Sequence, residues 1–192
     1  MKLQIICVAY ERVNSLVILQ RCFIEQSNPN WVLHIVYDGP APNKIKDVIV
    51  DDERIHFWES PERYENYGHP NRRTTLQTIE TETGDFILMT NDDNYYVPMF
   101  VEYMLQVVNR RIGMVYCDTV HSHAAYDINY SELRENCIDM GAFIVREDIA
   151  KQTGFNHDHF SADGMYCEEC LRACHRRRLK AFKIHKCLFI HN

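Results

Sequence analysis

The sequence lacks an apolar run close to the roughly 20 residues that a membrane-spanning helix requires, which argues against a transmembrane protein. It also lacks an excess of basic residues: 27 acidic and 21 basic residues give a formal charge of −6, which argues against a general affinity for nucleic acid. The first seven residues resemble the start of a strand and not the basic and apolar leader of a secreted protein. We therefore expect a soluble, cytoplasmic protein with no nucleic-acid partner.

No repeat, low-complexity tract or linker interrupts the chain. Its 192 residues, of which 46% are hydrophobic, suffice for one domain with a sizeable core and leave little room for a second. We expect a single domain over 1–192, which is either a whole protein or one domain of a longer polypeptide.

The eight cysteines do not form the regular framework of a disulfide-rich protein, because most of them lie inside apolar segments. This pattern predicts reduced thiols and a reducing compartment. Cys167, Cys170 and Cys174 recur at helical spacing and share one face of a predicted helix. A zinc site completed by Cys187 or His175 is the alternative, although three ligands on one continuous helix differ from the usual zinc geometry.

Strand-like and helix-like stretches alternate along the first half of the chain, which is the pattern of a doubly wound α/β protein with a mostly parallel sheet. The second half, 119–192, loses this alternation, and there we expect irregular structure or a small antiparallel element, then a helix over 163–176. The predicted strands of the first half are 3–9, 31–37, 55–58, 86–89 and 113–117, and its predicted helices are 16–26, 45–50, 74–81 and 99–108.

The segment from Asp85 to Pro98 is the most informative one, because an apolar run typical of a buried strand is followed by the four residues Asn91-Asp92-Asp93-Asn94. Carboxylate and amide oxygens suit a hard divalent cation, and Mg²⁺ or Mn²⁺ held by one or two carboxylates keeps positions open for substrate phosphates. The alternative is a polar turn that leads into a helix near Pro98.

Two further predicted strands also end in polar residues. The first strand is followed by Tyr10-Glu11-Arg12, and the second by Asp38-Gly39. In open α/β sheets ligands bind beyond the carboxyl ends of the strands, so we expect these residues and the acidic cluster to meet in one crevice.

The chain resembles the family 2 nucleotide-sugar glycosyltransferases of GT-A fold from its first strand to its last residues. Each motif is loose, but together they occur in the order of that family. They are a strand followed by Ala9-Tyr10-Glu11-Arg12 and a helix ending at Gln26, the turn Tyr37-Asp38-Gly39-Pro40, the acidic cluster through Pro98, Gly141 to Arg146, and Gly154-Phe155 through Ala162-Asp163.

The chain departs from the family pattern at three positions. Glu11 replaces the usual Asn, Asn91 stands at the first acidic position of the metal motif, and Ala162 stands where the catalytic motif has Glu. The resemblance therefore implies that Asp93 is the principal metal ligand. His191, near the end of an apolar strand, is similar to a late metal-binding His of some GT-A enzymes, and an imidazole ligand would favour Mn²⁺ over Mg²⁺.

The resemblance also implies a catalytic base for the acceptor hydroxyl, and Asp163 is the candidate. An alternative is that Asp163 serves as the N-cap of its helix, a role that does not exclude the first. Asp158 or Glu168 are the alternative bases.

The remaining roles implied by the resemblance concern the donor. Asp38 would accept a hydrogen bond from the ring N–H of uracil, and Tyr10 would offer a stacking face or a backbone contact. Independently of the resemblance, Arg72 or Arg73 are candidates to reach the diphosphate, the alternative being a solvated basic start of a helix. Gly141 would let the backbone approach the donor sugar, and Asp139 would bind its hydroxyls. The full set of donor-binding candidates is Ala9, Tyr10, Glu11, Arg12, Asp38, Arg72, Arg73, Asn91, Asp92, Asp139 and Gly141.

The sequence thus predicts a metal-dependent, inverting glycosyltransferase that moves a sugar from a nucleotide sugar, with UDP-sugar favoured, to a hydroxyl of a glycan or glycoconjugate. Two alternatives stay open, namely an inactive sugar-nucleotide binding module and a sugar nucleotidyltransferase. The nucleotidyltransferase alternative is weakened by the loop after the first strand, because residues 9–14 contain none of the glycines of a phosphate-binding loop.

Overall fold

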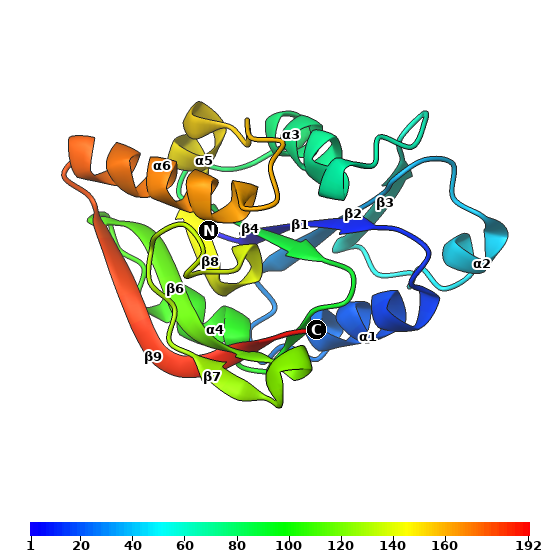
Figure 1. The fold of residues 1–192 in the computed structure, drawn as a ribbon, viewed down its shortest axis with the longest axis horizontal. Coiled ribbons are helices and arrows are strands. Elements are labelled where there is room, and N and C mark those ends of the chain that lie inside the picture. The colour runs from blue at the N-terminus through cyan, green and yellow to red at the C-terminus, as the bar shows by residue number, and fades with distance from the viewer.

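The computed structural model describes residues 1–192 and contains one mixed sheet of nine strands flanked by helices on both faces (Figure 1). The strands follow the order β3-β2-β1-β4-β8-β6-β9-β5, and β7 pairs with β6 outside this path. The strands are β1 (Leu3–Ala9), β2 (Trp31–Tyr37), β3 (Ile55–Glu59), β4 (Phe86–Asn91), β5 (Tyr95–Tyr96), β6 (Ile112–His121), β7 (Asp127–Asn129), β8 (Phe143–Arg146) and β9 (Lys180–His191).

The first half of the chain forms a parallel ladder of β3, β2, β1 and β4. β1 is buried over its whole length, and β4 is buried up to Asn91, where the chain leaves the core. Apolar strands buried on both faces are typical of a parallel sheet covered by helices. The predicted polar strand ends of β1, β2 and β4 therefore lie along one edge of the sheet.

The second half continues the same sheet with antiparallel pairs. β8 runs antiparallel to both β4 and β6, while β6 and β9 pair in parallel over a long ladder that ends at His121 and His191. Register shifts between Cys117 and Thr119 mark an irregularity in this ladder. The expected antiparallel element is thus part of the main sheet.

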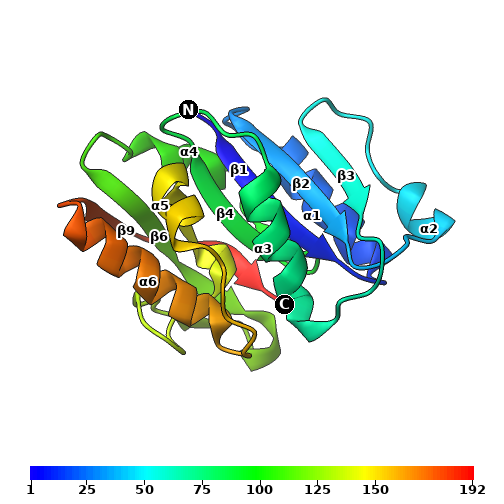
Figure 2. The same cartoon turned by 90° about the horizontal axis from the view of Figure 1, so that it is seen from above.

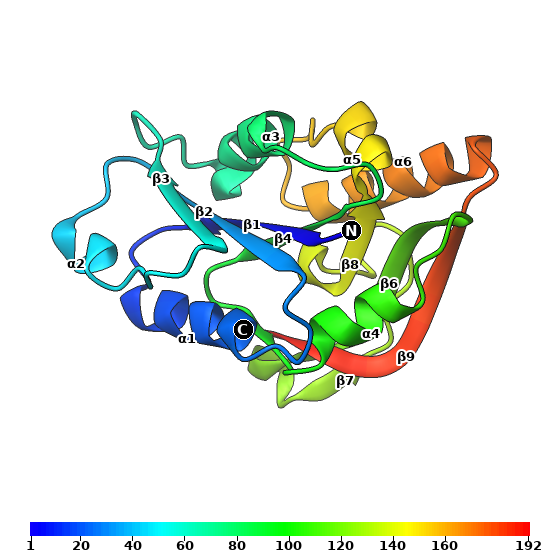
Figure 3. The same cartoon turned by 180° about the vertical axis from the view of Figure 1, so that it is seen from behind.

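The helices form two layers. Helices α3, α5 and α6 cover one face of the sheet, and α1 and α4 cover the other (Figures 1 and 2). The view from behind shows α2 beyond β3, at the opposite end of the molecule from β9 (Figure 3). The helices are α1 (Val13–Ile24), α2 (Asn43–Lys46), α3 (His69–Thr78), α4 (Phe100–Gln106), α5 (Glu147–Thr153) and α6 (Ala162–Arg176), with short 3₁₀ turns η1 (Asn66–Gly68), η2 (Ser122–Ala124) and η3 (Met140–Ala142).

The predicted α/β fold with a mixed, mostly parallel sheet is confirmed, and the differences concern boundaries. α3 begins at His69, five residues earlier than predicted, because Pro70 occupies its first turn, where a missing N–H costs nothing. The predicted helix over 45–50 is a single turn ending at Lys46. β5, β7 and α5 are not predicted by the sequence pattern.

The three cysteines of α6 are free and buried in the core, and none of them belongs to a cluster that could hold a metal ion. Burial raises the pKa of the Cys167 thiol well above its ordinary value, so its thiolate form is disfavoured. The zinc alternative is therefore not supported. No helix combines the length and apolar character that a membrane crossing needs.

Candidate active site

Two cavities adjoin each other beyond the carboxyl ends of the parallel strands. The first cavity, about 600 Å³, is bordered by residues 8–12 at the end of β1, by Asp38 after β2 and by loop residues 63 and 65–68. The second cavity, about 350 Å³, is bordered by Asp139, Asp163 and His191 from the second half of the chain. Tyr67, Arg72 and Asn91 line both cavities and form a shared wall. The predicted convergence of three polar strand ends is thus found at the first cavity.

Arg72 is the central residue of the shared wall. Its side chain is 1% exposed, and its guanidinium donates hydrogen bonds to the carbonyl of Tyr67 and to Oδ1 of Asn91. Burial lowers the pKa of Arg72 to about 10, which leaves it charged at neutral pH. Its Nε is buried without a partner. A buried cation that borders two cavities and keeps an unused donor is suited to bind an anionic group.

The neighbouring Arg73 points elsewhere. It donates to the carbonyl of Phe155 and forms an ion pair of 2.7 Å with Asp158, and it borders neither cavity. Of the two arginines that the sequence offered for an anion, the geometry therefore favours Arg72.

Asp38 is buried at the end of β2 and holds the loop that separates the cavities. Its two carboxylate oxygens accept hydrogen bonds from the backbone N–H groups of Tyr64 and Glu65 and from the Asn71 amide. Three of about four acceptor positions of the carboxylate are thus used within the protein. The base contact predicted for Asp38 stays a prediction, and the structure adds a loop-holding role.

That loop has an unusual backbone. Glu65, Asn66 and Tyr67 all have positive φ, at 56°, 46° and 56°, although none of them is glycine. Such conformations cost free energy and cluster at functional sites. Here they carry Tyr67 into the shared wall, where its side chain is 64% exposed and its ring meets Phe160 edge-on at 5.8 Å.

The acidic residues after β4 are engaged by Arg12. Its Nη1 lies 3.1 Å from Oδ1 of Asp92 and 2.7 Å from Oδ2 of Asp93. Asp92 also accepts a hydrogen bond from the N–H of Tyr10. Burial raises the pKa of Asp92 to about 6, although these two partners act in the opposite direction. The residues after β1 and β4 are thereby joined at the rim of the first cavity.

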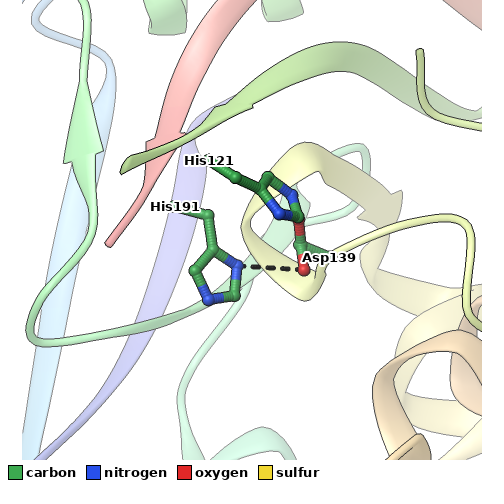
Figure 4. Close-up of side chains that lie close together, drawn as sticks. All are labelled: His121, Asp139 and His191. Atoms are coloured by element: carbon green, nitrogen blue, oxygen red, sulfur yellow. Dashed lines mark hydrogen bonds and ion pairs between the residues drawn. The ribbon is translucent and has the colours of Figure 1, made fainter. Parts of the chain in front are cut away.

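His121, Asp139 and His191 form a cluster in the second cavity (Figure 4). His121 Nε2 lies 2.9 Å from one oxygen of Asp139, and His191 Nδ1 lies 3.0 Å from the other. Burial would raise the pKa of Asp139, but the two histidines lower it below its usual value. The same carboxylate raises the pKa of His191. From sequence alone, Asp139 is expected at the donor sugar and His191 at the metal, and no motif marks His121.

Asp163 lies in the first turn of α6 and borders the second cavity. The helix N-cap is Ser161, so the interpretation of Asp163 as the cap is wrong by two residues. Burial raises the pKa of Asp163, and a hydrogen bond from the N–H of Gly164 opposes this only in part. The alternative bases are occupied elsewhere, since Asp158 pairs with Arg73 and Glu168 accepts from the N–H of Glu135.

Gly141 is packed inside the core. A Cβ at this position would lie 2.7 Å from Cζ of Phe189 and 2.7 Å from the hydroxyl of Tyr96. The absence of a side chain at Gly141 is therefore explained by close packing on β9 and β5, and it borders neither cavity.

Arg63 is a site residue that sequence reasoning missed. It borders the first cavity, and its guanidinium lies over the ring of Tyr10 at 3.9 Å. The ring of Tyr10, which was predicted to stack on a base, is thus covered by the Arg63 cation, and this cation–π contact stabilises both groups. No local motif marks Arg63, because a long loop places it above the first strand end.

The fold that carries this site is similar to that of solved glycosyltransferases. Residues 1–349 of Staphylococcus aureus TarS in complex with UDP-GlcNAc match 99% of this chain and 58% of their own length, with 13% identity and a TM-score of 0.76. A mannosyltransferase from Pyrobaculum calidifontis in complex with GDP-Man and Mn²⁺ matches 99% of this chain and 56% of its own length, with 11% identity and a TM-score of 0.74. The chain has the fold of GT-A glycosyltransferases.

This GT-A fold is the one that the sequence resemblance implied. The chain spans about 60% of the length of the TarS fragment without ligand, which it matches at a TM-score of 0.74. No family model matches the sequence, and no curated protein does. The fold is thus recognised through its three-dimensional arrangement, whereas residue identity is low throughout.

Proposed function

We propose that this protein is a metal-dependent, inverting glycosyltransferase that binds a nucleotide sugar in the first cavity and an acceptor hydroxyl in the second. The observation that carries the proposal is the shared wall: a buried, charged Arg72 borders both cavities at the carboxyl ends of the parallel strands. A diphosphate there would join a nucleoside on one side to a sugar on the other. The structural neighbours, which are complexes with UDP-GlcNAc and GDP-Man, support this assignment.

The first cavity suits a nucleoside diphosphate. Arg72 and Arg12 supply positive charge for phosphate oxygens, and Tyr10, Glu11 and Arg63 surround the space for the base. UDP is the nucleotide that we expect, as the family resemblance implies. Asp38 would act on the base mainly by holding the loop 64–68, and its remaining acceptor position would be available to the ring N–H.

The transfer itself needs a base in the second cavity. The acceptor oxygen forms its bond to the anomeric carbon as the bond from that carbon to the diphosphate oxygen breaks, and the electron pair leaves with the nucleoside diphosphate. Asp163 takes the proton of the acceptor hydroxyl. Burial raises the pKa of Asp163, which makes it a stronger base than an ordinary aspartate.

A divalent cation fits the residues present. The imidazole of His191 is a ligand type that Mn²⁺ accepts, and its buried Nδ1 lies 3.0 Å from a carboxylate oxygen without forming a hydrogen bond. When bound, the cation would neutralise charge on the leaving diphosphate. Arg72 assists from the shared wall, since hydrogen bonds to Tyr67 and Asn91 hold its guanidinium in place and no rearrangement is needed.

The acceptor is, on this proposal, a glycan or glycoconjugate. The mouth of the second cavity carries two exposed aromatic rings, Phe160 at 76% and Tyr67 at 64% exposure. Aromatic faces beside polar groups suit the apolar face and the hydroxyls of a sugar ring. The open rim of this cavity accommodates a ligand that extends into solvent.

Calorimetry tests the donor site directly. UDP and GDP are titrated into the native protein with and without Mn²⁺. The proposal predicts binding of UDP that strengthens with Mn²⁺, and binding of neither nucleotide would overturn it. A sugar nucleotidyltransferase would instead bind UTP with a sugar 1-phosphate and release pyrophosphate, so a pyrophosphate assay separates this alternative.

A further inference from the structure

We infer that His121, Asp139 and His191 form the cation site of this protein and that Asp93 is not needed to hold the ion. This inference deepens the proposed function, because it names the residues that bind the cation of the transfer. It adds His121, which no sequence motif marked, and it reassigns Asp139 from sugar recognition to metal binding.

The backbone itself brings the two histidines together. His121 and His191 end neighbouring parallel strands, and the register of β6 and β9 makes them direct partners across the ladder. Side chains at paired positions of adjacent strands project from the same face of a sheet. Their imidazoles therefore lie side by side, with ring centroids 5.0 Å apart. This placement depends on sheet pairing and not on a flexible loop.

Asp139 completes the set from the turn before η3. One candidate ligand atom from each of the three residues lies within 4.8 Å of the others. Bonds of about 2.1 Å on opposite sides of an ion place two ligand atoms about 4.2 Å apart. Shifts of a fraction of an ångström would thus close the three side chains around an ion. In Figure 4 both imidazoles lie beside the Asp139 carboxylate.

The chemistry of the cluster favours a cation. His191 Nδ1 is buried and faces the Asp139 carboxylate at 3.0 Å outside hydrogen-bond geometry, so a cation between the two groups would satisfy both. Two imidazoles and one carboxylate are the ligand set of catalytic metal sites that keep open positions. The set favours Mn²⁺ over Mg²⁺, because Mg²⁺ prefers oxygen ligands.

Asp93 is placed differently. Its carboxylate is 2.7 Å from the guanidinium of Arg12, which also contacts Asp92. An ion bound at Asp93 would have to displace this cation. The cluster of His121, Asp139 and His191 faces no arginine or lysine within its own contacts, and it borders the same cavity as Arg72 and Asn91. An ion held there lies on the side of the shared wall where the donor sugar would leave its diphosphate.

Electron paramagnetic resonance of Mn²⁺ tests the inference without any nucleotide. Mn²⁺ alone is titrated into the native protein, His121→Gln, Asp93→Asn and, as a matched control, His123→Gln. His123 has its ring 5.1 Å from that of His121 but is outside the ligand set. The free-ion signal reports affinity, and electron spin-echo modulation reports nitrogen coordinated to the bound ion. Thermal unfolding curves confirm that each variant is folded.

The inference predicts binding of Mn²⁺ with nitrogen coordination in the native protein, at least tenfold weaker binding in His121→Gln, and changes below threefold in Asp93→Asn and His123→Gln. Native protein that binds no Mn²⁺, or binds it without nitrogen coordination, would overturn it, as would a loss of binding in Asp93→Asn equal to that in His121→Gln. UDP is absent from these samples, so the Mn²⁺ measurement can be interpreted even if the protein does not bind a nucleotide.

Discussion

Arg72 donates a hydrogen bond to the side-chain oxygen of Asn91, and this pair forms the wall between the two cavities. The pair links the first turns of α3 to the end of β4. A donor bound across the wall would have its diphosphate beside the guanidinium. The adjacent Arg73 makes its contacts on the other side of the helix, with Phe155 and Asp158. The two arginines therefore provide a comparison within the same protein.

Arg72→Gln should weaken UDP binding about 10- to 100-fold, because a buried charge-assisted contact to phosphate is lost. Arg73→Gln should change it less than about threefold, since its ion pair is largely exposed. Calorimetry with UDP measures both. Equal losses in the two variants would contradict the placement of the diphosphate at the shared wall.

Asp163→Asn should lower the rate of sugar transfer about 100- to 10,000-fold and leave UDP affinity nearly unchanged, because the amide cannot accept the proton of the acceptor. Asp158→Asn, at one of the alternative bases, should lower it no more than about twofold. In the native protein the rate should fall as the pH drops through the pKa of Asp163, which lies above the ordinary aspartate value. A rate unaffected by Asp163→Asn would assign the base elsewhere.

The order of elements and the convergence of polar strand ends could be predicted from sequence, because apolar runs and turn residues are local signals. β9 illustrates what could not. Its apolar residues fall into two groups on either side of the polar pair His185 and Lys186, whereas the structure has one strand with a register shift at that pair. Long-range pairing with β6 keeps these polar residues in the strand.

The same limit applies to the site. Pairing of His121 with His191 follows from the register of two strands about 60 residues apart in sequence, which no local pattern encodes. The choice between Arg72 and Arg73 depends on which side of α3 faces the cavities, and packing alone decides it. The contacts of Gly141 with Tyr96 and Phe189 form only in the folded chain. The sequence could not reveal this packing, so Gly141 was predicted to adjoin the donor sugar.

Gly141→Ala should destabilise the protein by about 1–3 kcal/mol, because a methyl group would overlap Phe189 and Tyr96 in the packed core. The same substitution in a Phe189→Leu background should cost less, since leucine lacks the outer ring atoms. Chemical denaturation of the two pairs measures the difference. An equal cost in both backgrounds would show that contact with Phe189 is not the reason for the glycine.

Asp92 should make the stability of the protein depend on pH. Its pKa is raised from 3.8 to about 6, mainly by burial, so the folded state binds a proton more tightly than the unfolded state. The raised pKa of Asp92 adds up to about 3 kcal/mol to the free energy of unfolding at low pH. This stabilisation is lost as the pH rises through about 6. Asp92→Asn should remove it.

The quantity to measure is the difference in unfolding free energy between native protein and Asp92→Asn across pH 4 to 7, because other carboxylates titrate in both proteins. The difference should move in favour of the variant as the pH rises. A difference that is constant over this interval would show that Asp92 titrates at its ordinary value.

Turnover of a nucleotide sugar tests the central claim most directly. The native protein and Asp163→Asn are incubated with UDP-sugars, Mn²⁺ and a panel of glycan acceptors, and nuclear magnetic resonance follows the anomeric protons and the release of UDP. The account predicts that the native protein releases UDP and forms a glycoside of inverted anomeric configuration, while Asp163→Asn does not. Binding of UDP with no turnover of any donor would contradict it and would identify the protein as a sugar-nucleotide binding module.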